Sequence, residues 1–334
     1  MLVVYPYLIY PVLLTLVTTT LRRRVLTKDA DIKETENGQP KVSFIVAFYN
    51  EAEELPKKIT NTLASDYPSS SIEFIFVSDG STDASEEIVS SHPELTLIRT
   101  TRRVGKDLAL AVAMKKARGD IIIFSDIGTL ICPDTIDRFV DHFQDPACGA
   151  VSSSDQIHET RLSLEGAFIR MDMYARKCEA ELSSPVGVSG CLFAVRRELA
   201  IMLRHEQCWD MSIALICVRN GYRVVIDSHI PGIYRKATSA AIEFERKKRT
   251  IIHGINVVMS NLDLLNPFLY GCFSWQLLSR KLLRWFSPLA LTALMFNLLS
   301  LVVDWSIAIE DAGRYSSIVV TCLAGLLLLR LMHM

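Results

Sequence analysis

Acidic and amide side chains stand at the ends of three apolar runs of strand length. The first run, V-S-F-I-V-A-F-Y-N-E, ends with Asn50 and Glu51; the second, F-I-F-V-S-D-G-S-T-D, carries Asp79; the third ends with Asp126. Ligands of open α/β sheets bind at the carboxyl ends of the strands. Carboxylates at that edge suit a ligand with hydroxyls, a base edge or a metal-bound diphosphate, whereas a bare phosphate favours a Gly-rich loop and a Lys.

The elements that must position these side chains alternate regularly. Helix-like segments near 51–65, 83–91 and 106–117 separate strand-like runs near 42–48, 73–78, 95–99 and 120–125. This alternation predicts an α/β fold with a doubly wound, mostly parallel sheet. Right-handed crossovers then bring the carboxyl ends of the strands to one edge.

The N-terminal region has the pattern of a membrane anchor. Residues 1–21 carry no charged side chain, and Arg22, Arg23 and Arg24 follow directly. About twenty apolar residues span a bilayer, and a signal peptide would place its positive charge before the apolar run. We therefore expect a transmembrane helix over 1–21, with the cytoplasmic side beginning at residue 22 and a linker over 22–40.

The C-terminal region repeats this pattern. Residues 286–303 lack charge, and a shorter apolar run lies within 316–334. Basic and aromatic side chains fill 239–285, which is typical of helices at a membrane interface. We expect interfacial helices over 239–285, followed by a transmembrane helix over 286–303 and a full or partial transmembrane helix over 316–334.

The composition excludes other classes of protein. The 334 residues carry a net charge of −1, so no basic field favours nucleic acid as a partner. The eight Cys residues are scattered without a C-x-x-C pair, which indicates neither a zinc site nor a disulfide framework. This usage fits a reducing, cytosolic middle domain over 41–238.

The middle of the chain resembles the membrane glycosyltransferases of family 2, which have the GT-A fold. The resemblance covers about residues 40–300 and rests on motifs in the family's order: V-S-F-I-V-A-F-Y-N-E, V-S-D-G-S-T-D, R-R-V-G-K-D-L-A-L, G-D-I-I-I-F-S-D-I-G-T, V-S-G-C-L-F-A-V-R-R-E-L, W-D-M-S-I-A-L-I-C-V-R-N-G-Y-R-V-V and S-R-K-L-L-R-W-F-S-P. It implies an inverting transfer of a sugar from a nucleotide-diphosphate donor.

The resemblance implies a donor site along the strand ends. Asp79 would accept a hydrogen bond from a uracil N–H, although D-G-S-T-D is also good turn chemistry. The other residues implied in binding the nucleotide and its diphosphate are Phe48, Asn50, Glu51, Arg103, Lys106 and Asp126. For Lys106, a solvated position at a helix start explains the sequence as well.

The resemblance also implies a divalent metal at Asp126, the first acid of the family's Asp-x-Asp. Mg²⁺ or Mn²⁺ prefers a few carboxylates together with substrate phosphate oxygens. Here Gly128 replaces the second acid. The ion would therefore depend on Asp126, phosphates and water, or on a ligand from elsewhere such as His253.

Asp210 is the candidate general base. Inverting transfer needs a carboxylate to take the proton of the attacking acceptor hydroxyl. Asp210 stands at the start of an apolar helix, where it could also cap the helix. The two roles are compatible, because the helix dipole favours the ionised carboxylate.

Candidate acceptor residues are Gly190, Arg246 and Arg249. Gly190 permits close approach of an acceptor sugar, although a tight turn explains it too. The segment containing Arg246 and Arg249 replaces the family's Gln-x-x-Arg-Trp, with Arg246 at the Gln and Thr250 at the Trp. A basic helix on anionic lipid is the alternative interpretation of this segment.

These observations predict a multi-pass membrane enzyme with a cytoplasmic catalytic domain. Its expected partners are a UDP-sugar, a polysaccharide or lipid-linked acceptor, membrane lipids, and a second copy or other synthase and export subunits. Two alternatives stay open. One is a polyprenyl-phosphate sugar synthase, and the other is a catalytically silent binding subunit of a synthase complex.

Overall fold

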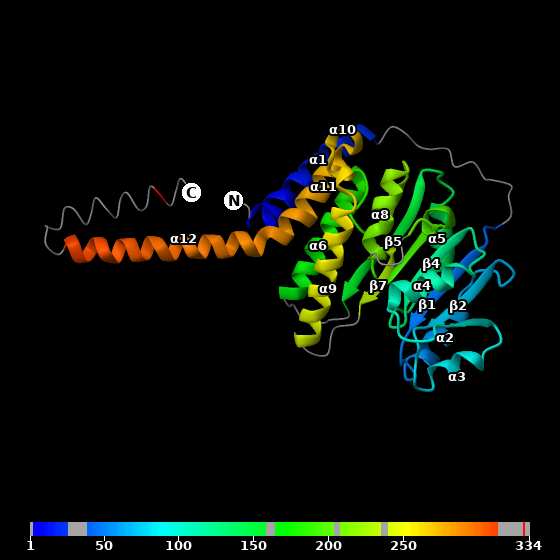
Figure 1. The fold of residues 1–334 in the computed structure, drawn as a ribbon. Helices are drawn as coiled ribbons and strands as arrows, with labels where there is room; N and C mark the ends of the chain where they lie inside the picture. Colours follow the sequence, from blue (N-terminus) through cyan, green and yellow to red (C-terminus); the bar gives the residue numbers. More distant parts are fainter. Residues whose placement is uncertain are drawn as a thin grey trace.

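A seven-stranded mixed sheet forms the centre of the computed structural model, with helices on both faces (Figure 1). The structure describes residues 3–25, 39–157, 164–203, 208–234, 240–312 and 330. The strand order is β3-β2-β1-β4-β6-β5-β7. The strands are β1 (Val42–Phe48), β2 (Ile72–Ser78), β3 (Leu95–Arg99), β4 (Ile121–Asp126), β5 (Cys148–Ile157), β6 (Leu192–Arg196) and β7 (Arg223–Tyr234).

The predicted α/β fold with a mostly parallel sheet is confirmed. Strands β1 to β4 pair in parallel, with Phe44 of β1 opposite Phe74 of β2 and Ile123 of β4. Strand β6 is the exception: it lies between β4 and β5 and runs antiparallel to both. The helices between the first strands are α2 (Leu55–Leu63), α3 (Ser85–Ser90), α4 (Lys106–Met114) and α5 (Thr135–His142).

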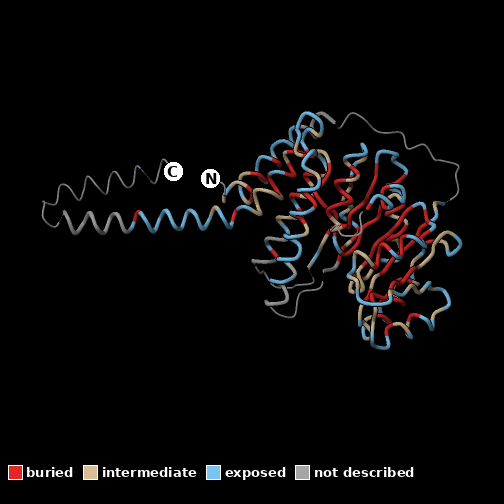
Figure 2. The backbone as a smooth tube through the Cα atoms, viewed as in Figure 1, coloured by how far each residue is buried: buried red, intermediate tan, exposed pale blue. Residues whose placement is uncertain are grey.

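Two apolar clusters cover the two faces of the sheet, because successive strand side chains point to opposite sides. Ile45 of β1 packs in the cluster that includes α4 and α8 (Trp209–Arg219). Its neighbours Phe44 and Val46 pack in the cluster that includes α2 and α5. Figure 2 shows the strands as the most continuously buried part of the chain.

Except for the short helix after β6, which packs against β6 and β4, the remaining helices lie beside the β7 end of the sheet and beyond it (Figure 1). The predicted interfacial region 239–285 contains α9, η2, α10, α11, η3 and the start of α12. These elements are η1 (Tyr5–Ile9), α1 (Tyr10–Val25), α6 (Leu164–Leu182), α7 (Arg197–Ala200), α9 (Ala240–Met259), η2 (Leu262–Leu265), α10 (Pro267–Tyr270), α11 (Cys272–Leu277), η3 (Leu278–Leu282) and α12 (Leu283–Ala312).

A buried ionic cluster joins α1 and η3, which are far apart in the sequence, to α6. The Tyr10 hydroxyl donates to Glu179 at 2.5 Å, and the Arg280 guanidinium donates to Glu179 at 2.5 Å and to Asp172 at 2.8 Å. Glu179 is fully buried and Arg280 is 3% exposed. Buried charges are tolerated only when they are paired and hydrogen-bonded, so this cluster fixes how α1 and η3 sit against α6.

Among the described residues, one helix is long and apolar enough to cross a membrane, at Cys272–Val302. It contains the predicted span 286–303 except for the final residue, and its α12 part is largely exposed in Figure 2. The predicted span 1–21 is not found as such a helix among the described residues, where η1 leads into α1 and α1 runs through the start of the predicted linker to Val25. The span expected within 316–334 falls outside the described residues, Arg330 excepted.

Candidate active site

A cavity of about 460 Å³ opens at the edge of the sheet where β4 ends. Five residues predicted for the donor, acceptor and base sites line it, from two helices before β7, one strand, one loop and α9: Lys106, Asp126, Gly190, Asp210 and Arg249. His253, the alternative metal ligand, lines it too. The other lining residues are Val104, Gly105, Asp107, Leu108, Leu110, Phe124, Ser125, Phe193, Cys208, Trp209 and Thr250.

Asp126 is the last residue of β4 and projects its carboxylate into this cavity. Its backbone N–H donates to the carbonyl of Cys191 at 2.8 Å, which fixes the strand end. The carboxylate forms an ion pair with Lys106, whose ammonium also donates to the carbonyl of Gly190 at 3.2 Å. Desolvation of this half-exposed side chain works to lower the pKa of Lys106, but the carboxylates of Asp126, Asp107 and Asp210 together raise that pKa.

Asp210 lies in the first turn of α8, on the other side of Gly190. Its Oδ1 atom accepts hydrogen bonds from the Cys208 thiol at 2.6 Å and from the Met211 N–H at 2.9 Å. Burial, together with the Asp210 carboxylate, raises the pKa of the Cys208 thiol, which keeps it protonated and able to donate. The Oδ2 atom of Asp210 lies toward Gly190.

Asp79, which is predicted to contact the nucleotide base, bonds to the loop that precedes α4. It is 5% exposed, and its carboxylate accepts from the backbone N–H groups of Val104 at 2.7 Å and Gly105 at 2.9 Å. Next to it, Gly80 has a φ of +70°, and a Cβ there would meet the backbone of Arg102 at 2.7 Å. Asp79 therefore orders the loop that delivers Lys106 to the cavity.

The Asn-Glu turn after β1 is joined to the loop after β2. The Asn50 side chain accepts from the Thr82 N–H at 2.8 Å, and the Glu51 N–H donates to Ser85 at 2.9 Å. Asn50 has a φ of 52°, a conformation that Asn tolerates better than most residues. Phe48 packs within the apolar core, 3% exposed, rather than on the cavity wall.

The three other predicted basic residues, Arg103, Arg246 and Arg249, differ in their relation to the cavity. Arg103 stacks on the Tyr49 ring at 4.2 Å and does not line the cavity. Arg249 on α9 does line it. Arg246 belongs to the same helix, but its side chain lies outside the described residues.

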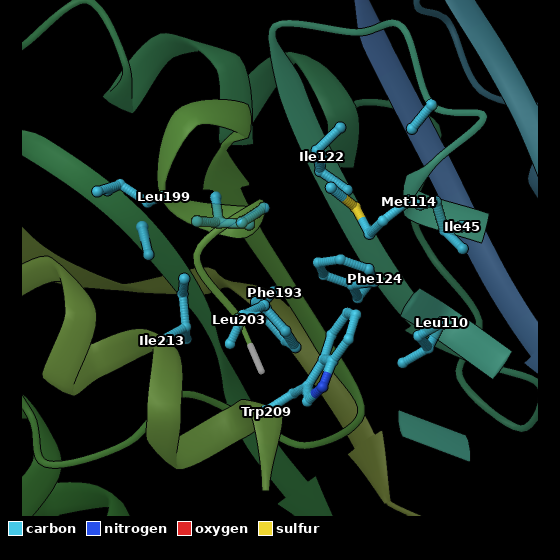
Figure 3. Close-up of a cluster of buried hydrophobic side chains, with 14 of the residues drawn as sticks. Ile45, Leu110, Met114, Ile122, Phe124, Phe193, Leu199, Leu203, Trp209 and Ile213 are labelled. Carbon is cyan, nitrogen blue, oxygen red and sulfur yellow. The ribbon is translucent and has the colours of Figure 1, made fainter. Parts of the chain in front are cut away.

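The floor of the cavity is aromatic. Phe124, Phe193 and Trp209 form a cluster in which Phe124 and Trp209 meet edge to face with ring centroids 5.3 Å apart (Figure 3). Apolar ring edges beneath a row of polar groups are typical of small-molecule sites. The cavity can therefore hold a ligand with both a flat apolar face and several hydroxyls.

Comparison with known proteins agrees with this geometry. Residues 43–202 match the sequence model of Glycosyl transferase family 2. This region is a Glycosyl transferase family 2 domain. The match begins in β1 and ends after α7, so it contains both Lys106 and Asp126 but stops before Asp210.

Curated relatives with sequence similarity to this domain are glycosyltransferases. A poly-beta-1,6-N-acetyl-D-glucosamine synthase of Staphylococcus aureus (strain COL) is 28% identical over 133 residues, which are 39% of this chain and 31% of that synthase. An N-acetylglucosaminyltransferase of Bradyrhizobium elkanii is 27% identical over 125 residues, 36% of this chain and 69% of the relative. The chain thus spans about a third of the synthase's length.

Solved structures extend the likeness in fold beyond the family 2 domain. The mannosyltransferase PcManGT of Pyrobaculum calidifontis, in complex with GDP-Man and Mn²⁺, has a TM-score of 0.68 at 23% identity and covers 94% of each chain. S. aureus TarS 1–349 has a TM-score of 0.52 at 18% identity and covers 74% of this chain and 72% of that one. These neighbours support a GT-A-like fold.

The residues at Asp126 fit a divalent ion that takes most of its ligands from a substrate. Among the described residues, no group of three or more His, Cys, Asp or Glu side chains could hold a metal by itself. Mg²⁺ is commonly bound by one or two carboxylates, substrate phosphates and water. Asp126 supplies one such carboxylate to the cavity.

The structure adds cavity residues that the sequence reasoning missed. Asp107, beside Lys106, faces the same space; burial, with a contribution from Asp210, raises its pKa to about 6. Cys208 and Trp209 flank the candidate base. Asp107, Cys208 and Trp209 stand next to or near Lys106 and Asp210 in the sequence, and this closeness was the available signal. Helix periodicity alone, however, does not predict that sequence neighbours line the same cavity.

Proposed function

We propose that this protein is a membrane-anchored inverting glycosyltransferase. It transfers a sugar from a nucleotide-diphosphate sugar, with a UDP-sugar as the expected donor, to a polysaccharide or lipid-linked acceptor. One observation carries the proposal: Asp126 and Asp210 line a single cavity. Gly190 lies between them, since its carbonyl accepts from Lys106, the ion-pair partner of Asp126, and Asp210 Oδ2 lies beside it. That arrangement separates a carboxylate for the diphosphate from a carboxylate for the acceptor.

Asp210 acts as the general base in this proposal. Two donors hold its Oδ1 atom, from Cys208 and Met211, and this orients the Oδ2 atom toward the space beside Gly190. An acceptor hydroxyl in that space loses its proton to Oδ2 as its oxygen attacks the anomeric carbon. The bond from that carbon to the diphosphate oxygen breaks as the new glycosidic bond forms.

Lys106 and Asp126 form the diphosphate side of the site. A divalent ion bound at Asp126 would neutralise charge on the departing nucleoside diphosphate. Lys106 is held at the same place by Asp126 and the Gly190 carbonyl, so its ammonium can pair with a diphosphate oxygen. The structure of TarS with UDP-GlcNAc and that of PcManGT with GDP-Man support a nucleotide sugar as the donor.

The helices beyond α8 support a membrane location with the catalytic domain on the cytoplasmic face. The apolar helix Cys272–Val302 follows α10, in which Phe268 is 95% exposed. On α9, Ile251, Ile252 and Ile255 are also exposed. Exposed apolar side chains next to a candidate span suit insertion at the bilayer surface. A multi-pass arrangement with further spans at 1–21 and 316–334 remains a prediction.

A lipid-linked phosphate is a second candidate acceptor. Arg249 and His253 line the cavity from α9, the helix whose exposed isoleucines face away from the sheet domain's core. The cationic Arg249, on a helix with exposed apolar side chains, suits a phosphate that is presented by a lipid. The protein would then be a polyprenyl-phosphate sugar synthase.

Turnover of nucleotide sugars by membranes that contain the full-length chain tests the proposal. A panel of UDP- and GDP-sugars is incubated with wild type and with Asp210→Asn, with polyprenyl phosphate or glycan as the acceptor. We expect one donor to be consumed by wild type and not by the variant. Consumption of no donor by folded wild type would contradict the proposal and favour a binding subunit.

A further inference from the structure

A lysine is buried beneath the strand end that carries Asp126. Lys58 lies on α2 and is 0% exposed, in contrast to its exposed neighbour Lys57. Burying an ammonium group is unfavourable unless several hydrogen bonds compensate for the lost water. A role for Lys58 must therefore be sought in the groups that surround its Nζ atom.

Those groups belong to the turn that follows β4. The Lys58 ammonium donates to the Ser125 hydroxyl at 2.7 Å and to the backbone carbonyl of Thr129. The Phe44 ring lies below it, with the centroid 5.4 Å from Nζ. The two acceptors flank Asp126, one residue before it and three residues after it, so a single cation contacts both ends of the turn.

The turn also has backbone hydrogen bonds of its own. The Thr129 N–H donates to the Asp126 carbonyl at 3.1 Å, and the Asp126 N–H donates to Cys191. Both bonds act on the backbone at Asp126. Asn61, also on α2, exchanges two hydrogen bonds of 2.8 Å with Ile131, two residues beyond the turn. Lys58 contacts the turn itself, at Ser125 and at Thr129.

We propose that Lys58 is a positioning residue of the donor site, whose ammonium holds the Ser125–Thr129 turn so that the Asp126 carboxylate points into the cavity. The proposal rests on the function proposed above, since it assigns Asp126 to the diphosphate. Lys58 itself does not line the cavity and touches no substrate.

The position of Lys58 favours this role over simple filling of the core. Burial lowers the pKa of Lys58 to about 7, although the nearby Asp126 carboxylate opposes the shift. Replacing a buried ionic group by an apolar residue of similar shape is often neutral or stabilising for a fold. A lysine that served only the core would therefore be replaceable by Met without any effect on the turn.

The test compares Lys58→Met with Lys57→Met in the full-length chain in detergent. Hydrogen exchange of the backbone amides in the Ser125–Thr129 turn, the thermal midpoint and the KM for the nucleotide sugar are measured for each. For Lys58→Met we expect exchange in the turn and the KM to rise about tenfold or more, since a hydrogen bond to a charged group is lost. The thermal midpoint and kcat should change much less.

Lys57→Met should match wild type in all of these measurements. Ser125→Ala removes one acceptor without removing the cation, and should raise exchange in the turn by a smaller factor. Unchanged exchange in Lys58→Met would overturn the proposal. So would a rise spread evenly over β1, β2 and β4 with a lowered thermal midpoint, because that result describes a core residue. Exchange does not depend on turnover, so an inactive wild type would refute the proposed function while this measurement still decides the role of Lys58.

Discussion

The Oδ2 atom of Asp210 lies 3.6 Å from the position that a Cβ atom at Gly190 would take. The carbonyl of the same glycine accepts a hydrogen bond from Lys106, the partner of Asp126. Gly190 thus stands between the two carboxylates, with its missing side chain on the side of the candidate base. The space that a side chain would occupy there is available to an acceptor hydroxyl.

Gly190→Ala should impair the acceptor more than the donor. The added methyl group makes ordinary van der Waals contact with Asp210, so the fold should be retained. We expect the KM for the acceptor to rise about tenfold, because one extra methyl group in a pocket changes discrimination by about 10- to 200-fold. The KM for the nucleotide sugar should stay within about twofold. An unchanged acceptor KM would place the acceptor elsewhere.

Asp210→Asn should remove transfer without removing donor binding. The amide keeps the shape of the side chain but cannot take a proton, and general base catalysis contributes about 10²- to 10⁴-fold. Rates of sugar transfer and the Kd of the nucleoside diphosphate are the measurements. Asp141→Asn, an exposed acid on α5, serves as the matched control. Equal loss of diphosphate affinity and transfer would argue against a role as base.

Asp107 should give the protein a specific dependence of stability on pH. Burial raises the pKa of this carboxyl from 3.8 to about 6, so between these values the folded state holds a proton that the unfolded chain has released. Its contribution to stability is complete below about pH 3.8 and is lost as the pH rises through 6. The measurement is the thermal midpoint of wild type and Asp107→Asn from pH 4 to 7.

The difference between the two midpoints, wild type minus Asp107→Asn, should fall as the pH rises and become flat above about pH 6. Glu53→Gln, an exposed acid outside the cavity, should give a flat difference over the same range. A difference that grows with pH would mean that the folded state favours ionised Asp107, contrary to this environment.

Removal of divalent ions should stop turnover, with recovery on addition of Mn²⁺ or Mg²⁺. Because Gly128 replaces the second acid of the motif, the proposed ion depends on the donor's phosphates, so the metal concentration needed for the half-maximal rate should fall as the donor concentration rises. Gly128→Asp supplies the second acid of the family motif and should lower that concentration about tenfold. Turnover that survives EDTA would show that Lys106 and other cations suffice.

Much of the fold followed from hydrophobic patterning. The four apolar runs before residue 126 became β1 to β4, since each is bounded by residues that favour turns and separated by a segment with helical spacing. The predicted helix near 51–65 begins later, at Leu55, because the Asn50–Glu54 segment is held in a turn against the loop after β2. Local propensity does not report such a contact.

The N-terminal segment shows where patterning was insufficient. Residues 1–21 look like a membrane span by composition, yet Tyr10 and Leu14 are fully buried in a cluster with Ala175 and Cys178 of α6. An apolar surface can be covered by protein or by lipid, and composition does not distinguish these. Only the packing of α1 against α6 shows that part of this surface is covered within the chain.

For this protein, the sequence by itself determined the α/β class, the family 2 resemblance and the acids at the strand ends, because these depend on residue types and short spacings. Tertiary structure decided which of those acids share a cavity. The antiparallel insertion of β6 beside β4 brings Gly190 between Lys106 and Asp210, and the folding of α2 buries Lys58 below Asp126. These contacts join residues far apart in the chain, and their geometry is set by the packing of the whole sheet rather than by any local pattern.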